Sequence, residues 1–182
     1  EIIGRLHATG KYDIAELAGY GKLDDKEIFS HPWKIYPNMP DINDTASVED
    51  YNSNVTNQFG EWKFEETCLD FKPDIVCDIR DFWMMEFEER SLFRRCFHWL
   101  IMPTVDASPQ HPQWLSTYAN ADAVLSYSEW GMNILNEESG GKVNCLGIAP
   151  PAADNVYTPV HDKDAHKVSL GLEANSIIIG TV

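Results

Sequence analysis

The stretch FKPDIVCDIRDFW, residues 71–83, decides the fold. Its centre, Ile75–Cys77, is a continuous apolar run of the kind that forms strands buried on both faces of a parallel sheet. Asp78, Arg80 and Asp81 follow directly, so a strand that looks buried leads into three charged side chains. Ligands of open α/β sheets bind beyond the carboxyl ends of the strands, which makes these charges the first candidates for a site.

The same alternation continues toward the carboxyl terminus. After the strand at 74–79, the pattern predicts helices at 82–95, 109–120 and 128–138 and strands at 97–102, 122–127 and 142–148. Ser128 is placed to cap the last of these helices. Short apolar strands that alternate with helices predict an α/β fold with a doubly wound, mostly parallel, Rossmann-like sheet.

The amino-terminal residues show a less regular pattern. Residues 1–10 look like the body of a helix, with Ile2, Ile3 and Leu6 on one face, whose preceding strand is absent from this sequence. Strands are expected within 11–21 and 33–38. A long polar surface loop is expected at 39–60, followed by a helix at 61–71 that Pro73 ends.

The chain is expected to hold one domain and the start of another. Residues 1–150 form the Rossmann-like domain, and residues 151–175 form a linker with a short polar helix. Residues 176–182, SIIIGTV, have the pattern of a buried strand, and a lone strand cannot bury both of its faces. We therefore predict that this strand begins a truncated second domain and does not pair centrally in the first sheet.

Charge and composition exclude several classes of partner. The 182 residues include 14 basic and 29 acidic side chains, a net charge of −15, and such a surface repels nucleic acid and anionic lipid. No window reaches the ~18 continuous apolar residues of a membrane span, and no signal-peptide pattern is present. The four cysteines form no CxxC pair, which argues against disulfides and a structural zinc. We expect a cytoplasmic protein.

Polar groups follow three successive strands, and in a parallel sheet they would line one edge. They are Asp78, Arg80 and Asp81 after the first strand, Thr104 and Asp106 after the second, and Ser126, Ser128 and Glu129 after the third. Asp106 is the most suggestive, because a carboxylate directly after an apolar run must be exposed or paired. Structural roles stay open: Arg80 can pair with a neighbouring aspartate, and Asp81 and Ser128 can cap the following helices.

Aromatic and imidazole side chains add further candidates. His111, in the loop SPQHPQW, can reach the same edge, whereas His98 lies within an apolar run and is a core candidate. Trp83 and Trp130 stand near strand exits, where an aromatic face suits a sugar ring, although core packing explains most tryptophans.

The remaining charge pattern predicts structure rather than chemistry. Glu86, Glu88 and Glu89, together with nearby arginines such as Arg90, fit a solvated helix with i, i+4 ion pairs. No phosphate-binding glycine loop, zinc-protease motif or nucleophile elbow occurs.

The order of motifs resembles the amino-terminal half of family-four retaining glycosyltransferases, which carry two Rossmann-like domains in the arrangement called GT-B. The segments are KPDIVCDIRDFW (72–83), VDASP (105–109), ADAVLSYSEWGMNIL (121–135), KVNCLGIAPPAADNVYTP (142–159) and LGLEANSIIIGTV (170–182). Residues 157–159, Tyr-Thr-Pro, look like the Phe-x-Pro of the family's linker. The resemblance covers 61–182 well and the first 40 residues loosely. The chain departs from the family at 151–153, where Gly-x-Asp is usual, and at Asp106, where many members have a histidine.

The resemblance implies that the complete enzyme moves a sugar from a nucleotide-sugar donor to an acceptor hydroxyl with retention, without a metal or other cofactor. The donor-binding residues of the family lie in the second domain, so this chain would hold the acceptor. Asp106 and Asp81 are then the expected catalytic carboxylates. The expected substrate-binding residues are Arg80, Trp83, Thr104, His111, Ser128 and Glu129.

Two other functions remain open. A nucleotide-sugar epimerase of similar fold would need acid and base residues in the crevice. A non-catalytic α/β binding module would use the strand-exit charges only as helix caps and ion pairs.

Overall fold

The structure, a computed structural model, describes residues 2–26, 28–152 and 158–179. The chain divides into two compact units, residues 1–151 and 152–182, which are considered separately. The first unit contains two parallel β-sheets with their helices, and the second contains helix α7. No helix among the described residues is both long and apolar enough to cross a membrane.

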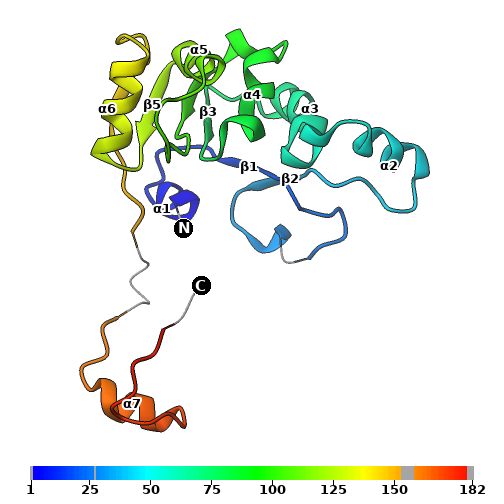
Figure 1. The fold of residues 1–182 in the computed structure, drawn as a ribbon. Helices are drawn as coiled ribbons and strands as arrows, with labels where there is room; N and C mark the ends of the chain where they lie inside the picture. Colours follow the sequence, from blue (N-terminus) through cyan, green and yellow to red (C-terminus); the bar gives the residue numbers. More distant parts are fainter. Residues whose placement is uncertain (1, 27, 153–157, 180–182) are drawn as a thin grey trace. The chain divides into compact units, whose positions relative to one another are not determined.

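The main sheet has four strands in the order β3-β4-β5-β6, and every neighbouring pair is parallel. The strands are β3 (Ile75–Asp78), β4 (His98–Ile101), β5 (Ala123–Ser126) and β6 (Cys145–Ile148). Helices flank this sheet (Figure 1), which confirms the predicted α/β class and the Rossmann-like arrangement. Each strand lies within the range that its apolar run predicted.

The helices between these strands build the core. They are α3 (Glu61–Phe71), α4 (Phe82–Arg90), α5 (Pro112–Asn120) and α6 (Glu129–Glu138). Trp99, Ile101 and Val124 of the sheet are fully buried and belong to one cluster with Met85 of α4 and Leu135 of α6. The core therefore lies between one face of the sheet and these helices.

The other face of the sheet is less covered than the sequence predicts. Ile75 of β3 is 59% exposed, and Leu146 of β6 is exposed as well. The reason is the strand order, because right-handed crossovers that advance in one direction along a sheet place successive helices on the same face.

Local side-chain bonds set the helix ends. Ser128 caps α6 as predicted, and its Oγ accepts a hydrogen bond from the Gly131 amide at 3.0 Å. Helix α5 begins later than expected, because His111 occupies the cap position and Pro112 the first turn. The helix expected at 82–95 ends at Arg90, where Ser91 is extended and a 3-10 turn, η3 (Arg94–Cys96), follows.

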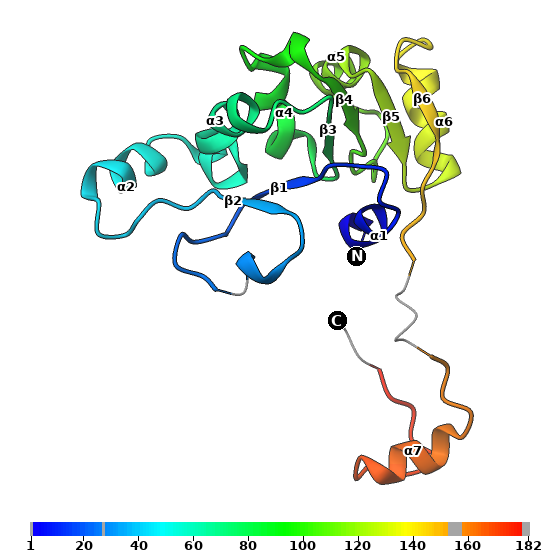
Figure 2. The same ribbon diagram turned by 180° about the vertical axis from the view of Figure 1, so that it is seen from behind.

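The amino-terminal part adds a second, smaller sheet. Helix α1 (Ile2–Ala8) precedes β1 (Ala15–Ala18), a 3-10 turn η1 (Ile28–Ser30) and β2 (Lys34–Pro37), and the two strands pair in parallel. In Figures 1 and 2, α1 and α3 lie on opposite sides of β1. Both expected strands are present.

The predicted loop at 39–60 is wrong. It contains helix α2 (Thr45–Asn52) and a 3-10 turn, η2 (Val55–Phe59). Asp44 accepts a hydrogen bond from the Ser47 amide at 3.3 Å, and Asn54 accepts one from the Thr56 amide at 3.2 Å. The polar residues that resemble a loop composition are therefore helix caps.

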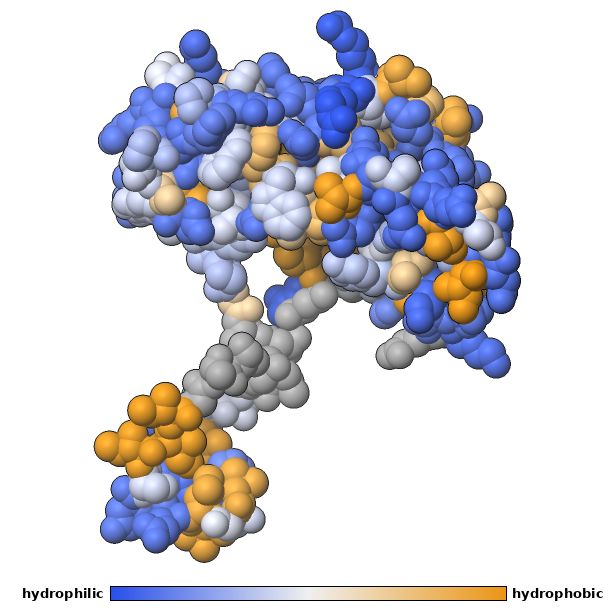
Figure 3. Space-filling model, turned by 45° about the vertical axis from the view of Figure 1, so that its right-hand side comes forward, coloured by the Kyte–Doolittle hydropathy of each residue, from blue (hydrophilic) through white to orange (hydrophobic). Residues whose placement is uncertain are grey.

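The second unit contains α7 (Lys163–Ser169), the short polar helix that the sequence predicts in the linker. Asp162 caps it, accepting from the Ala165 amide at 2.9 Å. Residues 176–179, part of the expected strand, form no strand, and Ile177 and Ile179 are exposed, because no neighbouring strand pairs with them among the described residues. Apolar surface is prominent on this unit (Figure 3). Residues 153–157 and 180–182 of the predicted linker and strand lie outside the described residues.

Leu135→Ala tests the core. Leu135 is fully buried in the central cluster, so we expect the free energy of unfolding to fall by about 2–5 kcal/mol, measured by urea denaturation. Leu69→Ala on the exposed face of α3 is the control and should cost less than ~0.5 kcal/mol. Equal losses at the two positions would contradict this assignment of the core.

Candidate functional site

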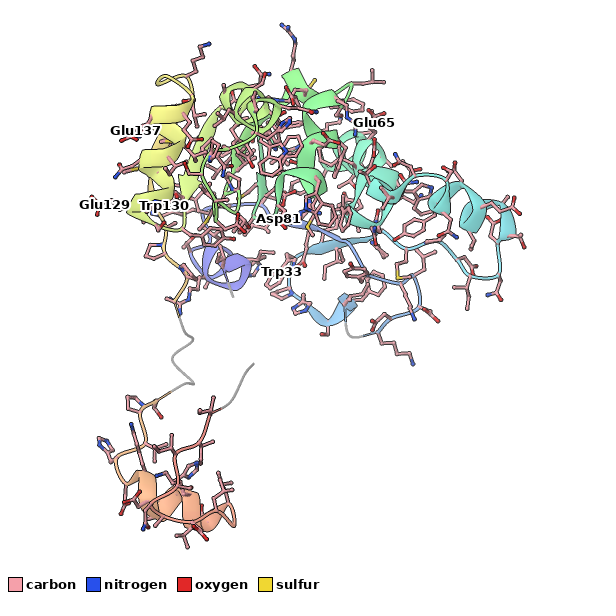
Figure 4. All side chains as sticks on the ribbon, viewed as in Figure 1. Trp33, Glu65, Asp81, Glu129, Trp130 and Glu137 are labelled. Carbon is pink, nitrogen blue, oxygen red and sulfur yellow. The ribbon has the colours of Figure 1, made fainter. Side chains whose placement is uncertain are left out.

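The carboxyl ends of the four parallel strands meet at one edge of the main sheet. Asp81 follows β3, Asp106 follows β4, and Ser128 follows β5, so all three lie at this edge. Figure 4 shows Asp81, Glu129 and Trp130 toward the same end of the fold, whereas Glu137 lies at the other end of α6. We call this edge, with the residues that follow the strands, the strand-exit edge.

Asp81 and Asp106 lie near a common buried side chain, Tyr118 of α5. Burial raises the pKa of the Tyr118 phenol, and the negative charges of Asp81 and Asp106 add to that effect. The two carboxylates thus act on the same phenol through their charges, although they follow different strands.

Neither of these carboxylates is used in a hydrogen bond or ion pair among the described residues. Asp81 occupies the cap position of α4 with an extended backbone, yet its side chain makes no capping hydrogen bond. The sequence left open that the Asp81 carboxylate caps α4, and it does not. Asp106 is exposed and Asp81 is half-buried, so both oxygen pairs can accept hydrogen bonds from a ligand.

Arg80, in contrast, is engaged inside the protein. Its Nε donates to Asp78 Oδ1 at 2.5 Å, its Nη2 donates to Asp78 Oδ2, and its Nη1 donates to the carbonyl oxygen of Phe59. The guanidinium also lies 3.7 Å from the Glu88 carboxyl group. Arg80 thus ties η2 to the end of β3. The ion pair with a neighbouring aspartate, which the sequence left open, is confirmed, and three of the five guanidinium N–H groups are used within the protein.

Glu88 is the buried acid that sequence reasoning missed. It is 3% exposed, accepts a hydrogen bond from the Trp99 indole, and shares a hydrogen bond with Asp78. Burial raises the pKa of Glu88 well above its ordinary value, and the negative charge of Asp78 raises it further. The assignment of Glu88 to a solvated helix is therefore wrong, and the three-residue spacing from Met85 on the buried face was the available signal.

The expected pair between Glu86 and Arg90 is also replaced. Arg90 instead lies 3.7 Å from Glu61, at the start of α3. Tertiary contact between α3 and α4 brings this acid within reach, which helical spacing alone could not indicate.

Two tryptophans present indole surface close to the strand-exit edge. Trp83, in the first turn of α4, is 48% exposed and packs edge-on against Phe59 with ring centroids 4.9 Å apart. Trp130, in the first turn of α6, is 47% exposed beside Glu129, which is also exposed (Figure 4). Half of each large apolar side chain therefore remains available to a ligand.

The other predicted residues divide between structural and free positions. Ser128 and His111 are helix caps, and His111 Nδ1 accepts from the Gln113 amide at 3.2 Å. Thr104 is exposed after β4. His98 lies at the opposite, amino end of β4, exposed and 3.7 Å from Asp122, so it is not in the core and is not part of this edge.

Gly131 is a second residue whose importance only the structure shows. A Cβ atom at this position would lie 2.7 Å from Ser126 Oγ and 3.3 Å from Val105 Cβ. The end of β5 and the residue Val105, which follows β4, therefore approach the start of α6 too closely for a side chain at this position.

The described residues include no group of three or more His, Cys, Asp and Glu side chains that could hold a metal ion. The site defined by this geometry is a carboxylate edge with exposed indoles on an α/β sheet. Protein-family models and curated proteins were compared with the chain, and none matches it.

Glu88→Gln tests the buried acid through pH. Because the pKa of Glu88 is raised in the folded state, its protonated form stabilises the fold below the unfolded pKa, and this contribution is lost as pH rises through the folded pKa. Glutamine mimics the protonated acid at every pH. We expect the free energy of unfolding of Glu88→Gln, relative to that of the wild type, to rise with pH above ~4.5. The rise should be at most ~1.4 kcal/mol per pH unit, measured by urea denaturation at each pH. Glu137→Gln, on the surface, is the control. The same pH dependence of the unfolding free energy in Glu88→Gln and in the wild type would contradict the prediction.

Proposed function

We propose that this chain is the acceptor-side part of a retaining glycosyltransferase of the family-four type. The observation that carries the proposal is that Asp81 and Asp106 follow neighbouring parallel strands at the strand-exit edge, with carboxylates that have no hydrogen-bond or ion-pair partner among the described residues. The order of motifs along the sequence supports the same function, and the Rossmann-like sheet is compatible with it.

The chemistry of this edge suits a hydroxyl-rich acceptor. Ionised carboxylates accept hydrogen bonds from sugar hydroxyls, and the exposed faces of Trp83 and Trp130 can contact the apolar face of a sugar ring. Asp106 and Asp81 would orient the acceptor hydroxyl toward the anomeric carbon of the donor. This contribution is one of positioning, which in well-oriented reactions is worth up to ~7–11 kcal/mol.

The donor is assigned to a second domain, as in the family that the sequence resembles. A nucleotide diphosphate needs fixed positive charge or helix amino termini around its phosphates. This chain has a net charge of −15, and Arg80, the one arginine at the strand-exit edge among the described residues, is bonded to Asp78. No metal or other cofactor is part of the proposal.

A non-catalytic binding module is the second candidate. It is favoured by the structural use of Arg80, Ser128 and His111, three of the predicted binding residues, in bonds within the protein. This alternative gives no role to the free carboxylates of Asp81 and Asp106.

Acceptor binding tests the first candidate directly. Asp81→Asn and Asp106→Asn should each weaken binding of a carbohydrate acceptor by about tenfold, because a hydrogen bond to a charged group is worth ~1.5 kcal/mol or more. Saturation-transfer NMR with a panel of mono- and oligosaccharides measures this. Glu137→Gln, at the far end of α6, is the matched control. Unchanged binding by both aspartate variants would favour the binding module with another site.

Donor binding provides an independent test. Titration calorimetry of the 182-residue chain with a panel of nucleotide sugars should show no binding at micromolar concentrations, because the acidic chain lacks a phosphate-binding motif. Micromolar affinity would place the donor site in the first unit and overturn the proposed division between donor and acceptor.

A further inference from the structure

The segment 102–111, which joins β4 to α5 and carries Asp106, lies along α6. Val105 is close to the start of this helix, since a Cβ atom at Gly131 would lie 3.3 Å from Val105 Cβ. At the other end of the helix its last residue, Glu138, is bonded to two further residues of the segment. The segment therefore follows α6 from its first turn to its last residue.

Glu138 accepts both of these hydrogen bonds. Its Oε1 accepts from Ser108 Oγ at 2.5 Å, and its Oε2 accepts from the Gln110 amide at 2.6 Å. The Ser108 hydroxyl and, to a smaller extent, the Gln110 amide hold the pKa of the Glu138 carboxyl below its ordinary value. The group is therefore ionised at neutral pH, and both hydrogen bonds are charge-assisted.

The middle of the segment has few other bonds. Among the described residues, no backbone-to-backbone hydrogen bond involves 104–110, and the remaining side-chain bond runs from Gln110 Nε2 to the Ala107 carbonyl at 2.6 Å. Gln110 is 4% exposed, so its amide would lack a partner without Glu138. Within the part of the chain that the structure describes, Glu138 thus accepts two of the three hydrogen bonds that hold 104–110.

Asp106 lies between two fixed points of this segment. On one side Val105 lies against the start of α6, and on the other Ala107 is bonded to Gln110, whose amide is bonded to Glu138. Asp106 itself is exposed. The place of its carboxylate is therefore set by its neighbours in the chain.

We propose that Glu138 is a positioning residue, which holds 104–110 against α6 and thereby fixes the Asp106 carboxylate at the strand-exit edge. The inference rests on the proposed function for the ligand, because a fixed carboxylate binds an acceptor hydroxyl at a smaller entropic cost than a mobile one. The holding of the segment does not depend on that function.

Amide hydrogen exchange measured by NMR tests the holding of the segment. In Glu138→Ala the Gln110 amide loses its acceptor, so its exchange should become about tenfold faster, and the backbone order parameter of Asp106 should fall. Glu137→Ala, at the exposed neighbouring position, is the matched control and should change neither quantity. Glu138→Gln should restore slow exchange, because its side-chain oxygen can accept from the same amide.

Stability of α6 does not confound this comparison. A carboxylate in the last turn of a helix is disfavoured by the helix dipole, so replacing Glu138 or Glu137 by alanine does not weaken the helix itself. Urea denaturation of both variants checks that the fold is retained.

Sugar binding tests whether Glu138 acts through Asp106. With an oligosaccharide from the panel used for Asp106→Asn, Glu138→Ala should raise the dissociation constant about three- to tenfold in the otherwise wild-type chain. In the Asp106→Asn background the same change should have less than about a twofold effect, because the carboxylate that Glu138 positions is already gone. A general loosening of the fold would weaken binding alike in both backgrounds.

Two results would overturn the proposal. One is unchanged exchange of the Gln110 amide in Glu138→Ala, and the other is an equal loss of sugar binding in the two backgrounds. Failure of the proposed function has a different signature, in which the wild type binds no sugar of the panel while exchange in Glu138→Ala is still faster. That result would contradict the acceptor function and support the holding of the segment by Glu138, which needs no sugar.

Discussion

Parallel pairing of β3, β4, β5 and β6 in chain order is the constraint on which the structure depends. Parallel strands end at one edge, so residues that follow different strands, such as Asp81 and Asp106, lie along that edge. The same order sends α4, α5 and α6 to one face of the sheet, because each crossover has the same hand. The carboxylate edge and the uneven covering of the sheet are therefore two results of one topology.

The charged residues after β3 divide into a structural and a free group. Asp78 and Arg80 form an ion pair that also approaches the buried Glu88, and the Arg80 guanidinium holds the backbone of η2. A buried charge must be paired, since an isolated one would cost several kcal/mol. Asp81, one residue beyond Arg80, has no such partner among the described residues and remains available to a ligand. A single strand end thus supports both the fold and the candidate site.

Exposed apolar surface is the other general property of this chain. Ile2 and Leu6 of α1, Ile75 of β3, and Ile177 and Ile179 of the second unit are all exposed. Apolar residues on strands and amphipathic helices normally face a neighbouring element, and an unpaired edge invites association. These apolar surfaces differ in chemistry from the acidic strand-exit edge.

The sequence by itself determined the fold class, the positions of the strands described in the two sheets, and the Ser128 cap, because each depends on a short run of residues. An apolar run such as Ile75–Cys77 favours a strand wherever it lies, and serine before a helix can accept the amide of the third residue along. Only the tertiary structure decided that Glu88 is buried against Trp99 and that Arg80 binds Asp78 and the backbone of η2. These outcomes depend on which distant groups come within a few ångströms of one another. The loop prediction at 39–60 was wrong for a related reason. Asp44 and Asn54 are residue types that occur in both loops and helix caps. Their flanking residues and the packing of the chain select the helix cap.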